Sequence, residues 1–83
     1  MIYLKYQILE RETIENADQF GETYDVALIR VWPTIQLFDV DLVVLNDGVH
    51  IVEPWGVCEY PAIKNAACRA ENSCEPIDVL VIM

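Results

Sequence analysis

The most reactive side chains in the sequence belong to three cysteines and one histidine, which together could hold a metal ion or form a redox-active thiol site. Cys58, Cys68 and Cys74 all fall between residues 56 and 76, and His50 lies shortly before them. Structural zinc sites usually take their ligands from close C-x₂₋₄-C pairs, and these cysteines are further apart. The spacing therefore favours ordinary reduced cysteines, and we expect no metal or other cofactor.

The segment that carries the cysteines has the pattern of a short helix over residues 61–72, with Pro61 in its first turn. One apolar stripe runs along this segment at helical spacing: Ile63, Ala66, Ala67 and Ala70. A helix of this length is about 16–18 Å long, which is too far for Cys58 and Cys74, at its two ends, to form a disulfide. Cys68 falls on the face away from the stripe. A Cys68–Cys74 bridge stays open only if the chain folds back sharply after the helix.

The other residue types that are common in catalytic sites stand alone in this sequence. His50 is expected beside a hairpin turn, and Ser73 is the only serine. Asp39 and Asp41 share one face of a predicted strand and could hold a hard cation, but no further ligand lies close in sequence. We therefore expect a protein without enzymatic activity.

The remaining segments predict a sheet. Alternating or β-branched apolar residues indicate strands over residues 2–9, 24–32, 35–45, 49–53 and 77–83. Asn46-Asp47-Gly48 is typical of a tight hairpin turn between the third and fourth strands. Residues 10–23 permit either a short helix starting near Thr13 or a long hairpin connection. The last strand is apolar on nearly both faces, so we expect it inside the sheet or between two protomers.

These elements predict an α+β fold in which a mainly antiparallel sheet of about five strands carries one short helix. The chain of 83 residues is expected to form a single domain, 1–83.

Composition excludes several classes of partner. Fourteen acidic residues against five basic ones give a formal net charge of −9. Direct binding to nucleic acid, or to an anionic membrane surface, requires Lys and Arg to neutralise phosphates. The sequence has no apolar run long enough for a signal peptide or a membrane helix. An odd number of cysteines fits a reducing compartment, so we predict a cytoplasmic protein.

The acidic residues are unevenly distributed. One group crowds the first connection, where Arg11 is the only base: Glu10, Glu12, Glu15, Asp18, Glu22 and Asp25. A second group occupies the stretch between Arg30 and Lys64, which contains no other Lys or Arg: Asp39, Asp41, Asp47, Glu53 and Glu59. Such a surface either serves solubility alone or complements a basic groove on a partner.

Aromatic–proline pairs recur at Trp32-Pro33 and Pro54-Trp55. Given the predicted hairpin, both tryptophans should lie at the end of the sheet opposite its turn. They are expected either as core residues beneath the helix or as an aromatic lip beside the acidic residues, where aromatic anchors often concentrate binding energy.

The leading hypothesis is a small acidic binding protein, an inhibitor or nucleic-acid-mimicking decoy that occupies the basic, nucleic-acid-binding site of a protein partner. By analogy of charge and size, a viral or mobile-element protein that blocks a host nuclease or a CRISPR complex is the natural setting. The predicted contact residues are Asp39, Asp41, Asp47, Glu53, Trp55, Glu59, Glu15, Asp18 and Glu22.

Two other hypotheses belong to different classes. One is a structural or adaptor subunit that forms a homodimer or larger oligomer through an open sheet edge at the last strand. The other is a thiol or metal-binding protein that uses Cys58, Cys68, Cys74 and His50.

Overall fold

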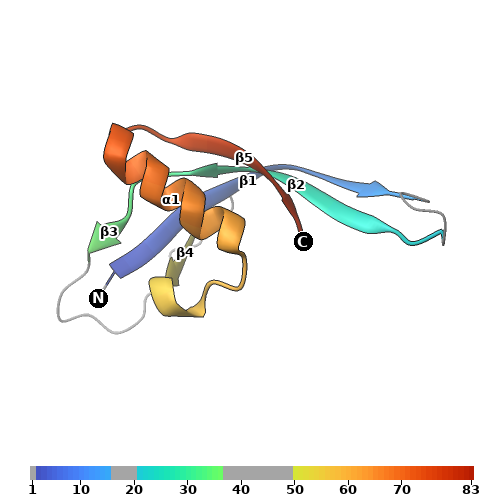
Figure 1. Cartoon of the computed structure of the whole chain (residues 1–83), viewed down its shortest axis with the longest axis horizontal. Helices are drawn as coiled ribbons and strands as arrows, with labels where there is room; N and C mark the ends of the chain where they lie inside the picture. Colours follow the sequence, from blue (N-terminus) through green and yellow to red (C-terminus); the bar gives the residue numbers. More distant parts are fainter. Residues whose placement is uncertain (1, 16–20, 37–49) are drawn as a thin grey trace.

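The structure is a computed structural model that describes residues 2–15, 21–36 and 50–83. These residues form five strands, a short 3-10 helix and one α-helix, whose arrangement is shown in Figure 1. Their bounds are β1 Ile2–Ile14, β2 Tyr24–Val31, β3 Ile35–Gln36, β4 His50–Pro54, η1 Trp55–Val57, α1 Pro61–Ser73 and β5 Ile77–Ile82. None of the helices in these ranges is long and apolar enough to cross a membrane.

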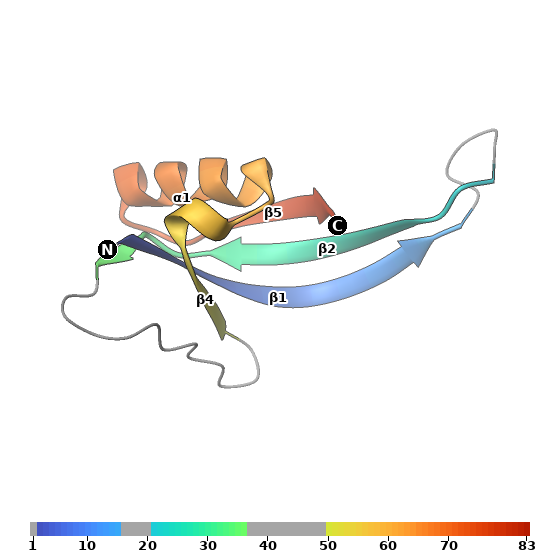
Figure 2. The ribbon, with the colours of Figure 1, turned by 90° about the horizontal axis from the view of Figure 1, so that it is seen from below.

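All described strand pairs are antiparallel. The sheet has the order β3-β1-β2-β5, and β4 also pairs with β1. With α1 on one face of this sheet, the predicted α+β fold is confirmed. Figure 2 shows the helix lying along β5 and β2, while the opposite face of these strands is not covered by a helix of the described ranges.

The helix forms where the apolar stripe predicted it, and one residue beyond. The four stripe residues are all fully buried: Ile63, Ala66, Ala67 and Ala70. Pro61 occupies the first turn, where its missing N–H costs no hydrogen bond. The helix ends at Ser73 and is capped by Cys74, whose φ of 57° is left-handed and whose backbone N–H donates to the Ala70 carbonyl. Small residues at three of the four stripe positions let α1 approach the sheet closely.

The core lies between α1 and one face of the sheet. Tyr6 of β1 faces Val31 of β2, and Ile8 faces Ile29. The buried core residues from the strands are Leu4, Tyr6, Ala27, Ile29, Val31 and Val81, and Cys58 closes the core from the connection before α1.

The first connection is a continuation of β1. The short helix considered from Thr13 onward is wrong at Thr13 and Ile14, which belong to β1, and the hairpin alternative is correct up to the described limit. These residues pair with β2 as far as Ile14↔Tyr24. Cross-strand partners outweigh the weak helical pattern, because Thr13 and Ile14 are β-branched and suit a strand. Residues 16–20 lie outside the described ranges.

A β-bulge divides β1 into two parts. The pairing runs Ile8↔Ile29 and then Glu10↔Leu28, so Leu9 is an extra residue in β1. Simple alternation would place Glu10 and Glu12 on the helix-covered face together with Leu4 and Tyr6. The bulge instead aligns them with Leu28 and Val26, on the opposite face.

Of two further strand predictions, one lies largely outside the described residues and the other needs correction. Of the third predicted strand only Ile35–Gln36 is a described strand, and the rest, with the Asn46-Asp47-Gly48 turn, lies outside the described residues. The last strand, β5, is at the edge of the sheet and not inside it. Its apolar pattern on both faces suggested double burial, but only one face is covered, and Leu80 and Ile82 on the other are exposed.

Candidate functional site

The densest described group of carboxylates lies on the β1–β2 hairpin beyond the bulge. We call residues 10–15 and 22–25 the acidic arm. Its carboxylate residues are all exposed: Glu10, Glu12, Glu15, Glu22 and Asp25. In Figures 1 and 2 this hairpin extends away from the helix-covered sheet, which gives the molecule extents of 49 × 27 × 21 Å.

Polar contacts connect the two strands of the arm and join its base to the end of the chain. The Thr13 hydroxyl donates to an Asp25 carboxylate oxygen at 2.8 Å across the hairpin. At the base of the arm the Met83 backbone N–H donates to the Asp25 carbonyl at 2.8 Å. Within the described residues, Glu10, Glu12 and Glu15 form no ion pair with a Lys or Arg of the chain. Their charges are therefore directed at solvent.

A second group of predicted contact residues lies around η1: Glu53 in β4, Trp55 in η1 and Glu59 in the connection to α1. Glu53 accepts a hydrogen bond from the Tyr6 hydroxyl at 2.9 Å. Burial, and then this bond to Glu53, raises the pKa of Tyr6 well above its ordinary value. Glu53 is thus engaged with the core, whereas Glu59 is exposed.

The tryptophans do not form one aromatic lip. Trp55 packs against the core beneath α1, and the Lys64 ammonium lies 6.0 Å from the centre of its ring. Trp32 follows β2, with the Lys5 ammonium 5.4 Å from its ring centre and the His50 ring 4.8 Å away, centre to centre. Because Lys5 alternates with the core residues of β1, Trp32 belongs to the sheet face opposite α1.

The structure separates the predicted contact residues. Glu15 and Glu22 belong to the arm, and Glu53, Trp55 and Glu59 belong to the η1 end, at the other end of the long axis. The remaining four, Asp18, Asp39, Asp41 and Asp47, lie outside the described residues. The described acids of the predicted contact set thus form two groups and not one face.

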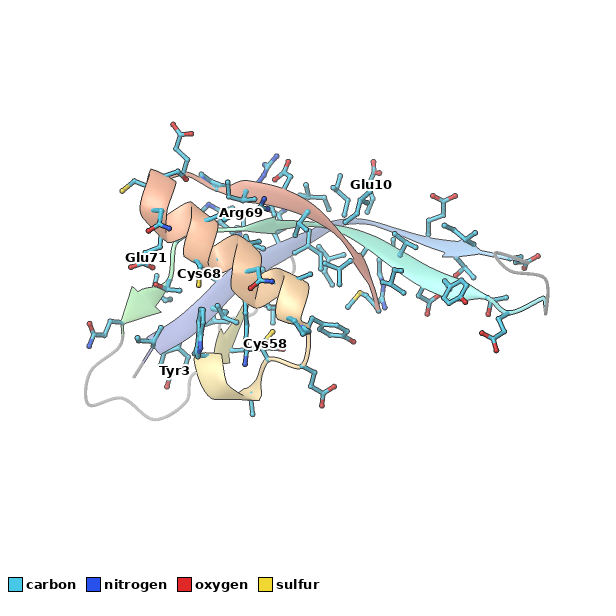
Figure 3. The ribbon with its side chains drawn as sticks, in the orientation of Figure 1. Tyr3, Glu10, Cys58, Cys68, Arg69 and Glu71 are labelled. Atoms are coloured by element: carbon cyan, nitrogen blue, oxygen red, sulfur yellow. The ribbon has the colours of Figure 1, made fainter. Side chains whose placement is uncertain are left out.

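The cysteines are dispersed as well. All three are free; Cys58 is buried in the core, and Cys68 and Cys74 are exposed. Figure 3 shows Cys58 in the connection below α1 and Cys68 on the helix itself. Over the described ranges no group of three or more His, Cys, Asp and Glu side chains is arranged to hold a metal ion. The three thiols therefore do not share one centre.

Several residues on the exposed surface were missing from the predicted contact set. Glu10, Glu12 and Asp25 were recognised as part of an acidic stretch, but without the strand their common location on one hairpin was not apparent. The β-branched pair Thr13-Ile14 was the available signal for it. Exposed Leu80 and Ile82 could not be found from their residue types, because an edge position depends on strand order.

No protein-family model matches the chain, and comparison with curated proteins and with solved structures gave no match.

Proposed function

We propose that this is a small non-enzymatic binding protein that inhibits a protein partner by occupying its basic, nucleic-acid-binding site, and that the acidic arm makes the contact. The observation that carries this proposal is the arm itself: a projecting hairpin whose Glu10, Glu12 and Glu15 carboxylates are exposed and, within the described ranges, form no ion pair with a Lys or Arg. A net charge of −9 adds a long-range attraction to a basic site.

The spacing of the arm suits a phosphate-binding surface. Alternate residues of a strand are about 6.8 Å apart on one face, so Glu10 and Glu12 are separated by roughly the through-space distance between neighbouring phosphates of one nucleic-acid strand. Lys and Arg side chains that bind neighbouring phosphates could therefore bind these carboxylates.

The η1 end is the weaker candidate for such a contact. There Glu53 is hydrogen-bonded to Tyr6, and the Lys64 ammonium beside Trp55 reduces the negative field. The arm has a single base, Arg11, among its five acids.

The setting of the proposal is the cytoplasm of a host cell, where a viral or mobile-element protein would meet a nuclease or a CRISPR complex. The free state of all three cysteines supports a reducing compartment.

The test is affinity capture from a candidate host lysate at about 50 mM and about 500 mM salt, since screening removes exposed charge–charge attraction over this range. We expect basic nucleic-acid-binding proteins to be retained at low salt and released at high salt. Recovery of only neutral or acidic proteins, unaffected by salt, would contradict the proposal.

Two variants with equal net charge locate the contact. Glu10→Gln/Glu12→Gln removes two charges from the arm, and Glu59→Gln/Glu75→Gln removes two exposed charges outside the arm, one on each side of α1. We expect the first pair to lose most of the captured partner and the second to retain it. The reverse result would assign the contact to a surface outside the arm.

The other partner predicted from the sequence is a second copy of the chain, which would pair through the open edge of β5.

A further inference from the structure

The outer edge of β5 has the properties of a pairing surface. β5 is the last strand in the order β3-β1-β2-β5, so one of its two edges has no partner among the described strands. Leu80 and Ile82 are 69% and 67% exposed, the highest values among the large hydrophobic side chains of the described residues. Natural proteins usually protect such an edge with charged side chains, proline or a bulge. The Ile77–Ile82 segment has no proline and no register shift, and its one charged residue, Asp78, is paired with Arg30 of its own chain.

The register with β2 decides which backbone groups face outward. The Met83 N–H donates to the Asp25 carbonyl, and the ladder continues through Ala27↔Val81 and Ile29↔Val79. In an antiparallel pair every second residue directs its N–H and C=O to the partner strand, so Val79, Val81 and Met83 bond to β2. Asp78, Leu80 and Ile82 therefore direct their backbone groups toward the open edge.

These outward groups are self-complementary. If a second β5 pairs antiparallel about a two-fold axis at Leu80, Leu80 faces its own copy and Asp78 faces Ile82 of the second copy. Each of the three outward residues then exchanges two backbone hydrogen bonds with the residue opposite it, which gives about six hydrogen bonds in total. A two-fold axis at Asp78 would instead place two carboxylates directly opposite each other, which is destabilising.

Charge also permits this arrangement. Asp78 is paired within its own chain to the Arg30 guanidinium at 2.9 and 3.2 Å. With the axis at Leu80 the two Asp78 residues are about 14 Å apart, beyond the ~8 Å Debye length at physiological ionic strength. Because the two β5 strands are antiparallel, the two acidic arms point in opposite directions, and their repulsion is small.

The exposed apolar side chains gain partners. Leu80 is beside Leu28 in the register, on the sheet face opposite α1. Pairing at Leu80 extends this pair into a continuous row of four leucines, two from each chain. We propose that the protein forms a homodimer in which two β5 strands pair antiparallel about Leu80, joining the two sheets into one. This goes beyond the proposed inhibitory function and does not rest on it.

The first test is the mass of the full chain in solution, measured by sedimentation across a range of protein concentrations. We expect a monomer–dimer equilibrium that shifts toward the dimer as salt rises, because salt screens the repulsion between two chains of net charge −9. Capture of a basic partner through the arm weakens with salt, so the two proposals fail independently. A monomer at all concentrations and salt levels overturns the dimer.

The second test disrupts hydrogen bonding at the open edge of β5. Leu80→Pro deletes one outward N–H without breaking a hydrogen bond to β2, and we expect at least a tenfold weaker dimer. Val57→Ser is the matched control, because Val57 is an exposed apolar residue of η1, away from β5, and its loss should leave the dimer unchanged. Circular dichroism confirms that both variants are folded. A dimer that persists in Leu80→Pro contradicts the proposal.

Cross-linking tests the register. In a Cys68→Ser/Cys74→Ser background, Leu80→Cys should form a disulfide-linked dimer on mild oxidation, since the paired Cα atoms are about 5.5 Å apart. Ile82→Cys, at a site of similar exposure, should not, because its copy is about 14 Å away. Efficient linkage at position 82 and none at position 80 would overturn the register, whatever the fold of the proline variant.

Discussion

The helix-covered sheet and the acidic arm are parts of the same two strands, β1 and β2, but they are stabilised in different ways. On the helix-covered side, Leu4, Ile29 and Val31 are fully buried under α1. In the arm, every described carboxylate is exposed, and the strands are joined by their backbone ladder and by the Thr13–Asp25 bond. The like charges therefore lie in a part of the molecule that buries little apolar surface.

This separation has a physical basis. A hairpin of two strands is marginal in water by itself, whereas three or more strands covered by a helix are independently stable. Repulsion among the carboxylates of the arm therefore acts on a part that contributes little to the free energy of unfolding, and the core tolerates this repulsion.

The largest expected difference comes from removing one side chain in each region. Ile63→Ala should lower the free energy of unfolding by about 2–5 kcal/mol, because Ile63 is fully buried between α1 and the sheet. Ile14→Ala in the arm should cost less, about 0.5 kcal/mol, because Ile14 is 42% exposed and lies outside the core cluster. Urea denaturation followed by circular dichroism measures both values.

If Ile63→Ala is too unstable to purify, Ile63→Val should still cost about 0.5–1.5 kcal/mol. Equal losses at positions 63 and 14 would show that the arm is as much a part of the core as the helix interface.

An intermediate effect is expected at Tyr6, which connects the core to the η1 end. Tyr6→Phe removes the hydrogen bond to Glu53 and should cost about 1–2 kcal/mol at neutral pH. Because the folded pKa of Tyr6 is raised above the ordinary 10.0, an unfolded chain releases this proton first. The stability of the native protein should thus fall as pH rises above 10.0, and more steeply than that of Tyr6→Phe. An identical pH profile for the two proteins would contradict this coupling.

The smallest effect is expected at the exposed ion pair between β2 and β5. The Arg30 guanidinium, through its hydrogen bond, holds the pKa of Asp78 below its usual range. A lowered pKa means that the pair stabilises the fold above the ordinary carboxyl pKa, and that this stability is lost in acid. Asp78→Asn should therefore cause a small decrease in the urea midpoint at neutral pH that disappears in acid and shrinks with salt. A large, salt-independent decrease would indicate that β5 is held mainly by this pair.

The elements that local pattern defines were predictable. The stripe of Ile63, Ala66 and Ala67 identified the helix and its buried face, because helical spacing and small residues are local properties. The strands at the start of the chain and at residues 24–32 were recognised by alternation and β-branched residues for the same reason.

The parts that depend on strand order were not predictable. Sequence cannot show that β5 is an edge strand, because burial on its second face depends on which strand lies beside it. Nor could alternation find the bulge at Leu9, since pairing with β2 determines it. The candidate site differs from the predicted one for the same reason. The sequence shows the acidic stretch within residues 10–25, but its location on one projecting hairpin follows from the continuation of β1.

The extra residue at Leu9 has a further consequence for how this molecule can change. Since side-chain orientation in a strand repeats every two residues, the one extra residue exchanges the two faces for every residue of β1 beyond it. Inserting two residues into each strand of the hairpin would lengthen its reach by about 7 Å while every side chain under the helix keeps its place. The length of the hairpin can thus change in steps of two residues per strand, and the helix-covered sheet does not have to change with it.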